Sequence, residues 1–134
     1  MHAPDFLHEL AATLGLPALQ PDAHGACSLR WRGVHLDLQA SEATGQLCVT
    51  ARVGHAVLSN RRTLCAGLLL ANLYLTENGR PHAVMDPLGE QVGLCHALPL
   101  SDCSGAVLVD RVERLAIACR ELRERLVAQQ LIVA

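Results

Sequence analysis

The spacing of apolar residues predicts a short amphipathic helix over residues 4–15. Apolar side chains recur there at intervals of three and four residues, which places them on one helical face. Pro4 suits the first helical turn, and Gly15 followed by Pro17 indicates its end. The apolar stripe consists of Phe6, Leu7, Leu10 and Leu14. Because so short a helix is not stable alone, we expect it to dock on the rest of the chain or on a partner.

The period of the pattern changes from 3.6 to two after a loop at residues 17–25. Apolar and polar residues alternate over residues 27–31 and 34–39, which the turn Arg32-Gly33 separates, and again over residues 47–53. Consecutive short runs of this kind predict three antiparallel strands with one buried face.

The helix predicted over residues 61–76 has more apolar residues than one face requires. Leu64 and Leu68 share one face, whereas Leu70 and Leu73 lie on another. A helix that packs on a single sheet needs only one apolar face, so a second cover is expected. In a chain this short, we expect that cover to be a second copy of the protein.

The remaining pattern predicts two strands and a long helix. Alternating residues flank the turn Asp86-Pro87-Leu88-Gly89, which has proline at its second position. A regular apolar stripe then predicts a helix over residues 105–128, and the four residues after Gln130 are too few to assign. The stripe comprises Leu108, Val112, Leu115, Cys119, Leu122 and Leu126. The fold class is therefore α+β, with the order α-β-β-β-α-β-β-α and helices packed on one antiparallel sheet.

Composition limits the classes of function. A chain of 134 residues that is 51% apolar is expected to form one domain, residues 1–134, with a substantial core. A net charge of −2 disfavours nucleic-acid binding. The N-terminal residues lack the basic segment of a signal peptide, and the apolar run 64–75 is too short to span a membrane, so we expect a cytoplasmic protein. Six cysteines without a C-x-x-C pair are then expected to be free thiols.

No motif in the sequence indicates catalysis. The seven histidines lack the spacing of zinc ligands, and no glycine-rich nucleotide-binding loop is present. We therefore expect no enzyme activity, no catalytic residue, no cofactor and no metal site. A Cys/His nucleophilic pair stays open as an alternative, because such partners meet only in the folded chain.

Three short motifs carry a resemblance to a known family. They are Ala71-Asn72-Leu73-Tyr74, Asp86-Pro87 and Leu98-Pro99-Leu100. Together with the order of elements, they resemble the class I type III secretion chaperones, the Tir-chaperone or CesT-like family. The resemblance implies a cytoplasmic homodimer of a Gram-negative bacterium. It would bind the N-terminal region of a secreted effector in extended form, through β-strand addition, and keep the effector soluble and export-competent. The export ATPase is a further candidate partner.

Surplus apolar surface suggests where these partners bind. The effector groove is expected to involve Phe6, Leu7, Leu10, Leu29, Trp31, Val34 and Leu36. The dimer is expected on one of two faces of the second helix, either Leu64, Leu68, Ala71 and Leu75, or Leu70, Leu73 and Tyr74. A regulatory binding module of the same fold, which sequesters a secretion or transcription regulator, is the alternative function.

Overall fold

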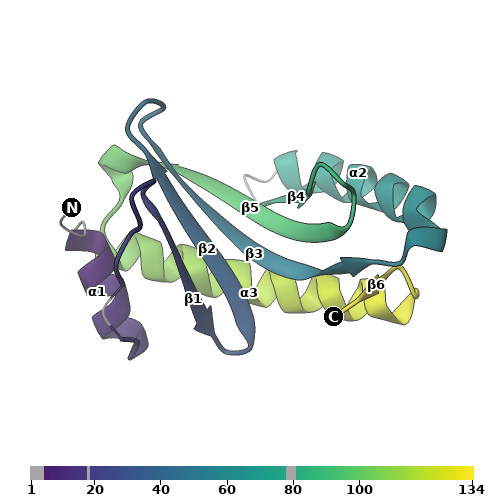
Figure 1. Cartoon of the computed structure of the whole chain (residues 1–134), viewed down its shortest axis with the longest axis horizontal. Helices are drawn as coiled ribbons and strands as arrows, with labels where there is room; N and C mark the ends of the chain where they lie inside the picture. Colours follow the sequence, from purple (N-terminus) through teal and green to yellow (C-terminus); the bar gives the residue numbers. More distant parts are fainter. Residues whose placement is uncertain (1–4, 18, 78–80) are drawn as a thin grey trace.

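One antiparallel sheet connects all the strands of the computed structural model, which describes residues 5–17, 19–77 and 81–134 (Figure 1). The strands are β1 (Ala26–Trp31), β2 (Val34–Ser41), β3 (Gln46–Ala56), β4 (His82–Met85), β5 (Gln91–Pro99) and β6 (Ile132–Val133). The helices are α1 (Asp5–Leu14), α2 (Arg61–Glu77) and α3 (Gly105–Ala128), with single 3₁₀ turns at Leu58–Asn60 and Leu100–Asp102. The side chains of residues 5, 6 and 74–77 lie outside the description.

The inner face of the sheet forms the core. The strand order is β1-β2-β3-β5-β4, and α3 runs along one face of this sheet with α1 against its N-terminal end (Figure 1). Alternation in the sequence produces this face, because every second residue of β2 and β3 is buried. The buried residues of these two strands are Val34, Leu36, Leu38, Leu47, Val49, Ala51 and Val53. The sheet therefore has an inner face under helices and an outer face without one.

Polar contacts at the N-terminus of α3 fix the position of α1. The Ser104 hydroxyl accepts a hydrogen bond from the Val107 N–H, and the Glu9 carboxylate of α1 accepts one from the Gly105 N–H at 2.8 Å. These bonds satisfy N–H groups that a helix cannot pair internally. A carboxylate is also favoured at the positive end of the helix dipole. Glu9 thus ties α1 to α3.

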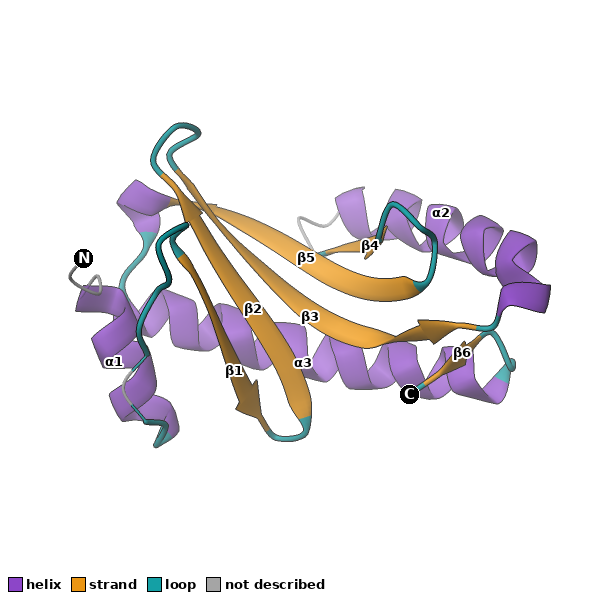
Figure 2. Cartoon of the chain, viewed as in Figure 1, coloured by secondary structure: helices purple, strands orange, loops and turns teal. Residues whose placement is uncertain are grey.

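The outer edge of β4 is closed by a side chain of α2. The Asn72 amide donates to the Ala83 carbonyl at 2.8 Å and accepts from the Ala83 N–H at 2.6 Å. The side chain therefore pairs with β4 as a neighbouring strand would. Leu64 and Leu68 of the same helix are buried, so α2 packs at this end of the sheet (Figure 2). The physical role of asparagine in the Ala71-Asn72-Leu73-Tyr74 motif is edge closure.

The apolar C-terminal residues, which the sequence left unassigned, form the short strand β6. It pairs with His55 and Ala56 at the end of β3. A Cβ atom added at Gly54 would lie only 2.6 Å from the Val133 carbonyl oxygen, so glycine permits this close approach. The pairing joins residues far apart in the sequence, which explains why local pattern did not predict it.

The predicted fold class and order of elements are confirmed. All eight predicted helices and strands are present, and the last helix has the predicted bounds. The third strand is longer than the alternating run 47–53, because it continues through an irregularity between Arg52 and Gly54. This extension provides the segment with which β6 pairs.

Replacement of Asn72 by alanine tests edge closure. Asn72→Ala leaves both backbone groups of the buried Ala83 without their partner, so we expect the free energy of unfolding to fall by about 2–4 kcal/mol. Urea denaturation followed by circular dichroism measures this change. The matched control is Asn60→Ala, which removes one exposed bond to the Gln130 carbonyl and is expected to cost about 0.5–1 kcal/mol. Equal losses in the two variants would contradict the proposed role of Asn72.

Candidate functional site: a cavity beside the open edge of β1

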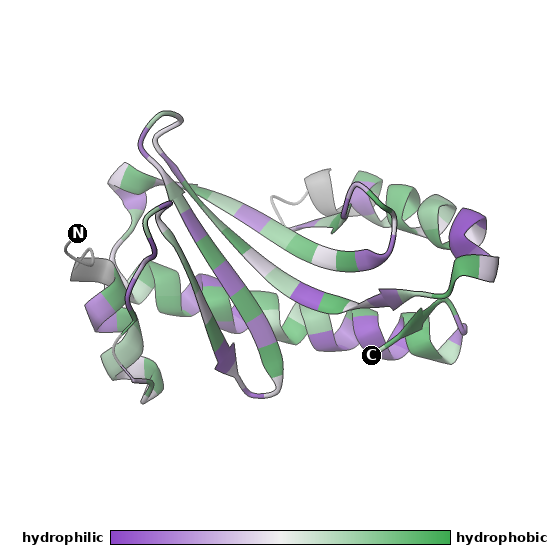
Figure 3. Cartoon of the chain, viewed as in Figure 1, coloured by the Kyte–Doolittle hydropathy of each residue, from purple (hydrophilic) through white to green (hydrophobic). Residues whose placement is uncertain are grey.

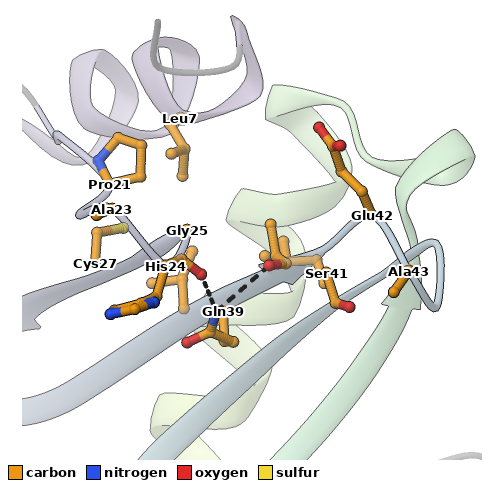
Figure 4. A pocket seen from close by; sticks show the side chains of 13 residues that line it. Leu7, Pro21, Ala23, His24, Gly25, Cys27, Gln39, Ser41, Glu42 and Ala43 are labelled. Carbon is orange, nitrogen blue, oxygen red and sulfur yellow. Dashed lines mark hydrogen bonds between the residues drawn. The ribbon is translucent and has the colours of Figure 1, made fainter. Parts of the chain in front are cut away.

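A cavity of about 480 Å³ lies between α1, the loop before β1 and the turn that joins β2 to β3 (Figure 4). Figure 4 shows Leu7 of α1 on one side and residues of the loop and strands on the other. The residues that line it are Leu7, Pro21, Ala23, His24, Gly25, Cys27, Leu38, Gln39, Ala40, Ser41, Glu42, Ala43 and Leu47. Apolar walls with a few polar groups at the rim are typical of a binding cavity.

Hydrogen bonds within the loop hold the cavity wall next to β1. The Asp22 carboxylate accepts from the N–H groups of His24 and Ala26, at 2.8 and 3.0 Å. Hydrogen bonds from the Ala26 and His24 N–H groups keep the pKa of Asp22 below its ordinary value, so the carboxylate is charged at neutral pH. The Gln39 side chain of β2 donates to the His24 carbonyl at 2.6 Å (Figure 4). Gly25, with φ of +78°, completes the turn.

The outer edge of β1 is open along the middle of the strand. A two-residue turn joins Trp31 to Val34, and residues that flank such a turn exchange backbone hydrogen bonds. Because paired residues alternate, Ser28 and Arg30 direct their N–H and C=O groups away from β2. Ala26 has the same parity, and its carbonyl accepts from the Asp22 N–H on the outer side. No backbone hydrogen bond within the described part of the chain reaches the outward groups of Ser28 or Arg30.

A polar cluster occupies the outer face of the same strands. The Asp37 carboxylate accepts from the Ser28 hydroxyl at 2.6 Å and from Arg52 at 3.0 Å, and lies 3.3 Å from the His35 ring. Partial burial acts to raise the pKa of Asp37, but the bonds from Ser28 and Arg52 outweigh it and lower the pKa. The cluster ties β1, β2 and β3 together, and it gives the outer face a polar character next to the open edge.

Most of the residues predicted to contact an effector belong to the core. Leu10, Val34 and Leu36 are fully buried, and Leu29 is 6% exposed. Within this chain they offer almost no surface, because their spacing places these side chains on the inward faces of α1, β1 and β2, and their contact with an effector stays a prediction.

Three predicted groove residues have different positions. Leu7 is buried in the chain but lines the cavity. Trp31 is partly buried at the end of β1, with the Arg32 guanidinium 4.3 Å from its ring centre. The side chain of Phe6 lies outside the description. Trp31 therefore lies partly accessible at the end of the core, and its contact with an effector stays a prediction.

Several cavity residues were not singled out in the sequence. Cys27 lies on the same face of β1 as Leu29 and Trp31, so the alternation places it there. Leu38 and Gln39 lie at the same cavity as Leu7 only because the folded chain brings α1 close to β2. Of these cavity residues, only Cys27 could have been recognised from the sequence, by its place in the alternating pattern of β1.

The two faces predicted for dimerisation differ in exposure. Leu64 and Leu68 are buried against the chain's own sheet, so a second copy cannot contact them without unfolding α2 from β4. On the other side, Leu70 and Leu73 are 70% and 67% exposed, and neighbouring Leu69 is 72% exposed. Figure 3 shows the hydrophobic character of α2 along most of its length. Ala71 is half-buried, and the side chains of Tyr74 and Leu75 lie outside the description.

The described residues offer little for catalysis. No group of three or more histidine, cysteine or acidic side chains comes close enough there to hold a metal ion. Burial raises the pKa of the Cys27 thiol beside the cavity, and the negative charges of Asp22 and Asp37 raise it further. A protonated thiol is a poor nucleophile. Among the described helices, none combines the length and apolar character that crossing a membrane requires.

Comparison with known proteins identifies the class. The Tir chaperone protein (CesT) family matches residues 5–123, and the chain therefore belongs to that family. It is a type III secretion chaperone by class, as the resemblance in the sequence indicated. Among curated proteins, no sequence matches the chain.

Solved structures share the fold at low sequence identity. The chain is similar to one in the ExsC-ExsE complex, with a TM-score of 0.77, 20% identity and coverage of 89% of each chain. A chain of the HopA1-SchA chaperone-effector complex gives a TM-score of 0.73 at 21% identity, over 89% of this chain and 91% of that one. One in the complex of the Yersinia pestis type III secretion chaperone SycH with a YscM2 fragment gives 0.68 at 20%, over 87% and 96%.

A Gly105→Ala substitution tests whether Glu9 positions α1 over the cavity. An added Cβ at Gly105 would collide with the Glu9 side chain and displace its carboxylate from the N-terminus of α3. We expect the free energy of unfolding to fall by about 1–3 kcal/mol, measured by chemical denaturation.

Gly67→Ala is the matched control. Gly67 lies within α2, and nothing occupies the space within 4 Å of an added Cβ there. Alanine favours a helix interior over glycine, so we expect a gain of about 0.5–1 kcal/mol. A Gly105→Ala protein as stable as the parent would show that Glu9 does not anchor α1.

Proposed function

We propose that this protein binds the N-terminal chaperone-binding segment of a type III secretion effector in extended form. The segment adds a strand to the outer edge of β1, and its inward side chains lie over the cavity beside Leu7 and Cys27. Binding keeps the segment soluble and ready for export. The open edge of β1 next to an apolar cavity is the observation that carries this proposal.

The contrast between the two edges of the sheet favours β1 over β4. Asn72 already occupies both outward backbone groups of Ala83 on β4. The outward groups of Ser28 and Arg30 on β1 have no such partner among the described residues. An extended segment gains main-chain hydrogen bonds only where the edge groups are free, so β1 is the edge that can accept it.

We further propose that the protein is a homodimer through the outer face of α2. Leu69, Leu70 and Leu73 form an apolar surface, and exposed leucines that cluster on one helix face indicate an interaction site. A two-fold contact between copies would cover this surface in both chains at once. The dimer surface and the β1 edge lie at opposite ends of the sheet (Figure 1), so each chain could carry effector without competition from its partner copy.

A proline on β1 tests strand addition. Proline lacks the backbone N–H, and at position 28 this N–H points away from β2. In Ser28→Pro the β1–β2 ladder therefore keeps its own bonds, whereas a carbonyl of the incoming strand loses the N–H that would donate to it. The protein is co-expressed with a candidate effector, and the two are purified together. We expect Ser28→Pro to retain at most a tenth of the co-purified effector.

Ser28→Ala is the matched control, because it removes the hydroxyl bond to Asp37 and keeps the N–H. It should co-purify effector as the parent does, and circular dichroism should show that both variants are folded. Full binding by folded Ser28→Pro would exclude β1 as the augmented edge. Co-purification of a transcription or secretion regulator in place of an effector would favour the regulatory alternative.

A charged surface on α2 tests the dimer. The double substitution Leu70→Glu with Leu73→Glu places two carboxylates on the outer face, and we expect a folded monomer in sedimentation velocity at micromolar concentration. Ile117→Glu, which changes a 48% exposed residue on α3, should leave the dimer intact. A parent protein that is itself monomeric would refute the dimer.

A further inference from the structure

The open edge of β1 carries positive charge at its hairpin end. Arg30 is exposed on the outer face of β1 and lies opposite His35 of β2. Among the described side chains, Arg30 takes part in no ion pair. It is therefore a free cation on the strand that, in the proposed function, pairs with the effector segment.

The nearby acidic group is already occupied. Asp37 binds Arg52 with 3.0 Å between Oδ2 and Nε, and it also accepts from the Ser28 hydroxyl. The other cation at this end, Arg32, lies over the Trp31 ring. The charge of Arg30 thus has no counterpart on the outer face of the three neighbouring strands, and a partner can supply one.

Strand geometry fixes where that counterpart would be. Successive side chains of an added strand point alternately to the inner and outer faces of the sheet. Those on the inner face continue the apolar series of Cys27, Leu29 and Trp31. The residue directly opposite Arg30 points to the outer face, about 5 Å away between Cβ atoms, where opposite charges attract and like charges repel.

We propose that the segment bound on β1 alternates apolar residues with polar ones and carries an acidic residue directly opposite Arg30. This inference rests on the proposed function and specifies the chemistry of its ligand. Apolar positions supply the affinity through burial, and the carboxylate sets the register of the segment along β1. A shift by one residue would put the apolar side chains on the polar outer face, and a shift by two would separate the carboxylate from Arg30.

The test uses nine-residue peptides of alternating valine and glutamine, with blocked ends and valine at both ends. The glutamine at position 4 of the peptide is kept or replaced by glutamate or lysine. Binding to the whole protein is followed by the emission of Trp31, which is the only tryptophan and lies at the end of β1. The same titrations are repeated with Arg30→Glu and with Arg30→Gln, at low and at physiological salt.

The parent should bind the glutamate peptide about two- to five-fold more tightly than the glutamine peptide, and the lysine peptide more weakly by a similar factor. Arg30→Glu should reverse this order, and Arg30→Gln should abolish the preference. The preference should also decrease as salt is raised, because the pair is exposed. The combined peptide and protein substitutions isolate the pair from other effects.

Other outcomes separate the two proposals. Equal binding of the three peptides, or a preference that Arg30→Glu does not change, would overturn the proposal of an acidic residue opposite Arg30. Strand addition on β1 would remain intact. If no peptide bound, both the acidic residue opposite Arg30 and the role of β1 as a general strand acceptor would be overturned. Effector binding by the chaperone is measured separately, by co-purification, so its failure is recognised independently.

Discussion

The packing of α3 on the inner face of the sheet is the contact on which the rest of the structure depends. Leu108, Val112, Leu115 and Cys119 are almost completely enclosed there. At about 1.5–3 kcal/mol for each large apolar side chain, this stripe is a principal source of stability. Since α3 covers one face only, the sheet retains a free outer face and two edges. What the protein can bind depends on whether the backbone groups at those edges are already hydrogen-bonded.

The two edges differ in whether their outward backbone groups are hydrogen-bonded. At β4, Asn72 supplies a side-chain amide in place of a neighbouring strand, so the edge is closed and α2 is held at the sheet. At β1, backbone groups remain available next to a cavity, and a polar cluster around Asp37 makes the adjacent outer face polar. Open edges are a liability for most proteins because they invite aggregation. Here the short, polar-faced edge of β1 fits the proposed function, in which the protein accepts an extended chain.

Exposed leucines on α2 complete this division of the surface. The helix buries Leu64 and Leu68 under its own sheet and presents Leu70 and Leu73 outward. Sequence periodicity separated these faces correctly but could not rank them, because both have leucine at helical spacing. Burial ranks them. For the same reason, periodicity could not separate groove residues from core residues, since an apolar residue on a strand is far more often core than binding surface.

The sequence by itself determined the fold class, the order and approximate bounds of eight elements, and the family. These depend on local periodicity, on turn residues such as Arg32-Gly33 and Asp86-Pro87, and on short motifs, all of which are written contiguously in the chain. Only the tertiary structure decided which edge of the sheet is open, that Leu7 meets Cys27 and Leu38 at one cavity, and that β6 pairs with β3. Each of these depends on contacts between distant segments. Local pattern specifies which face of an element is apolar, whereas the packing of the whole chain decides which apolar and polar groups remain uncovered.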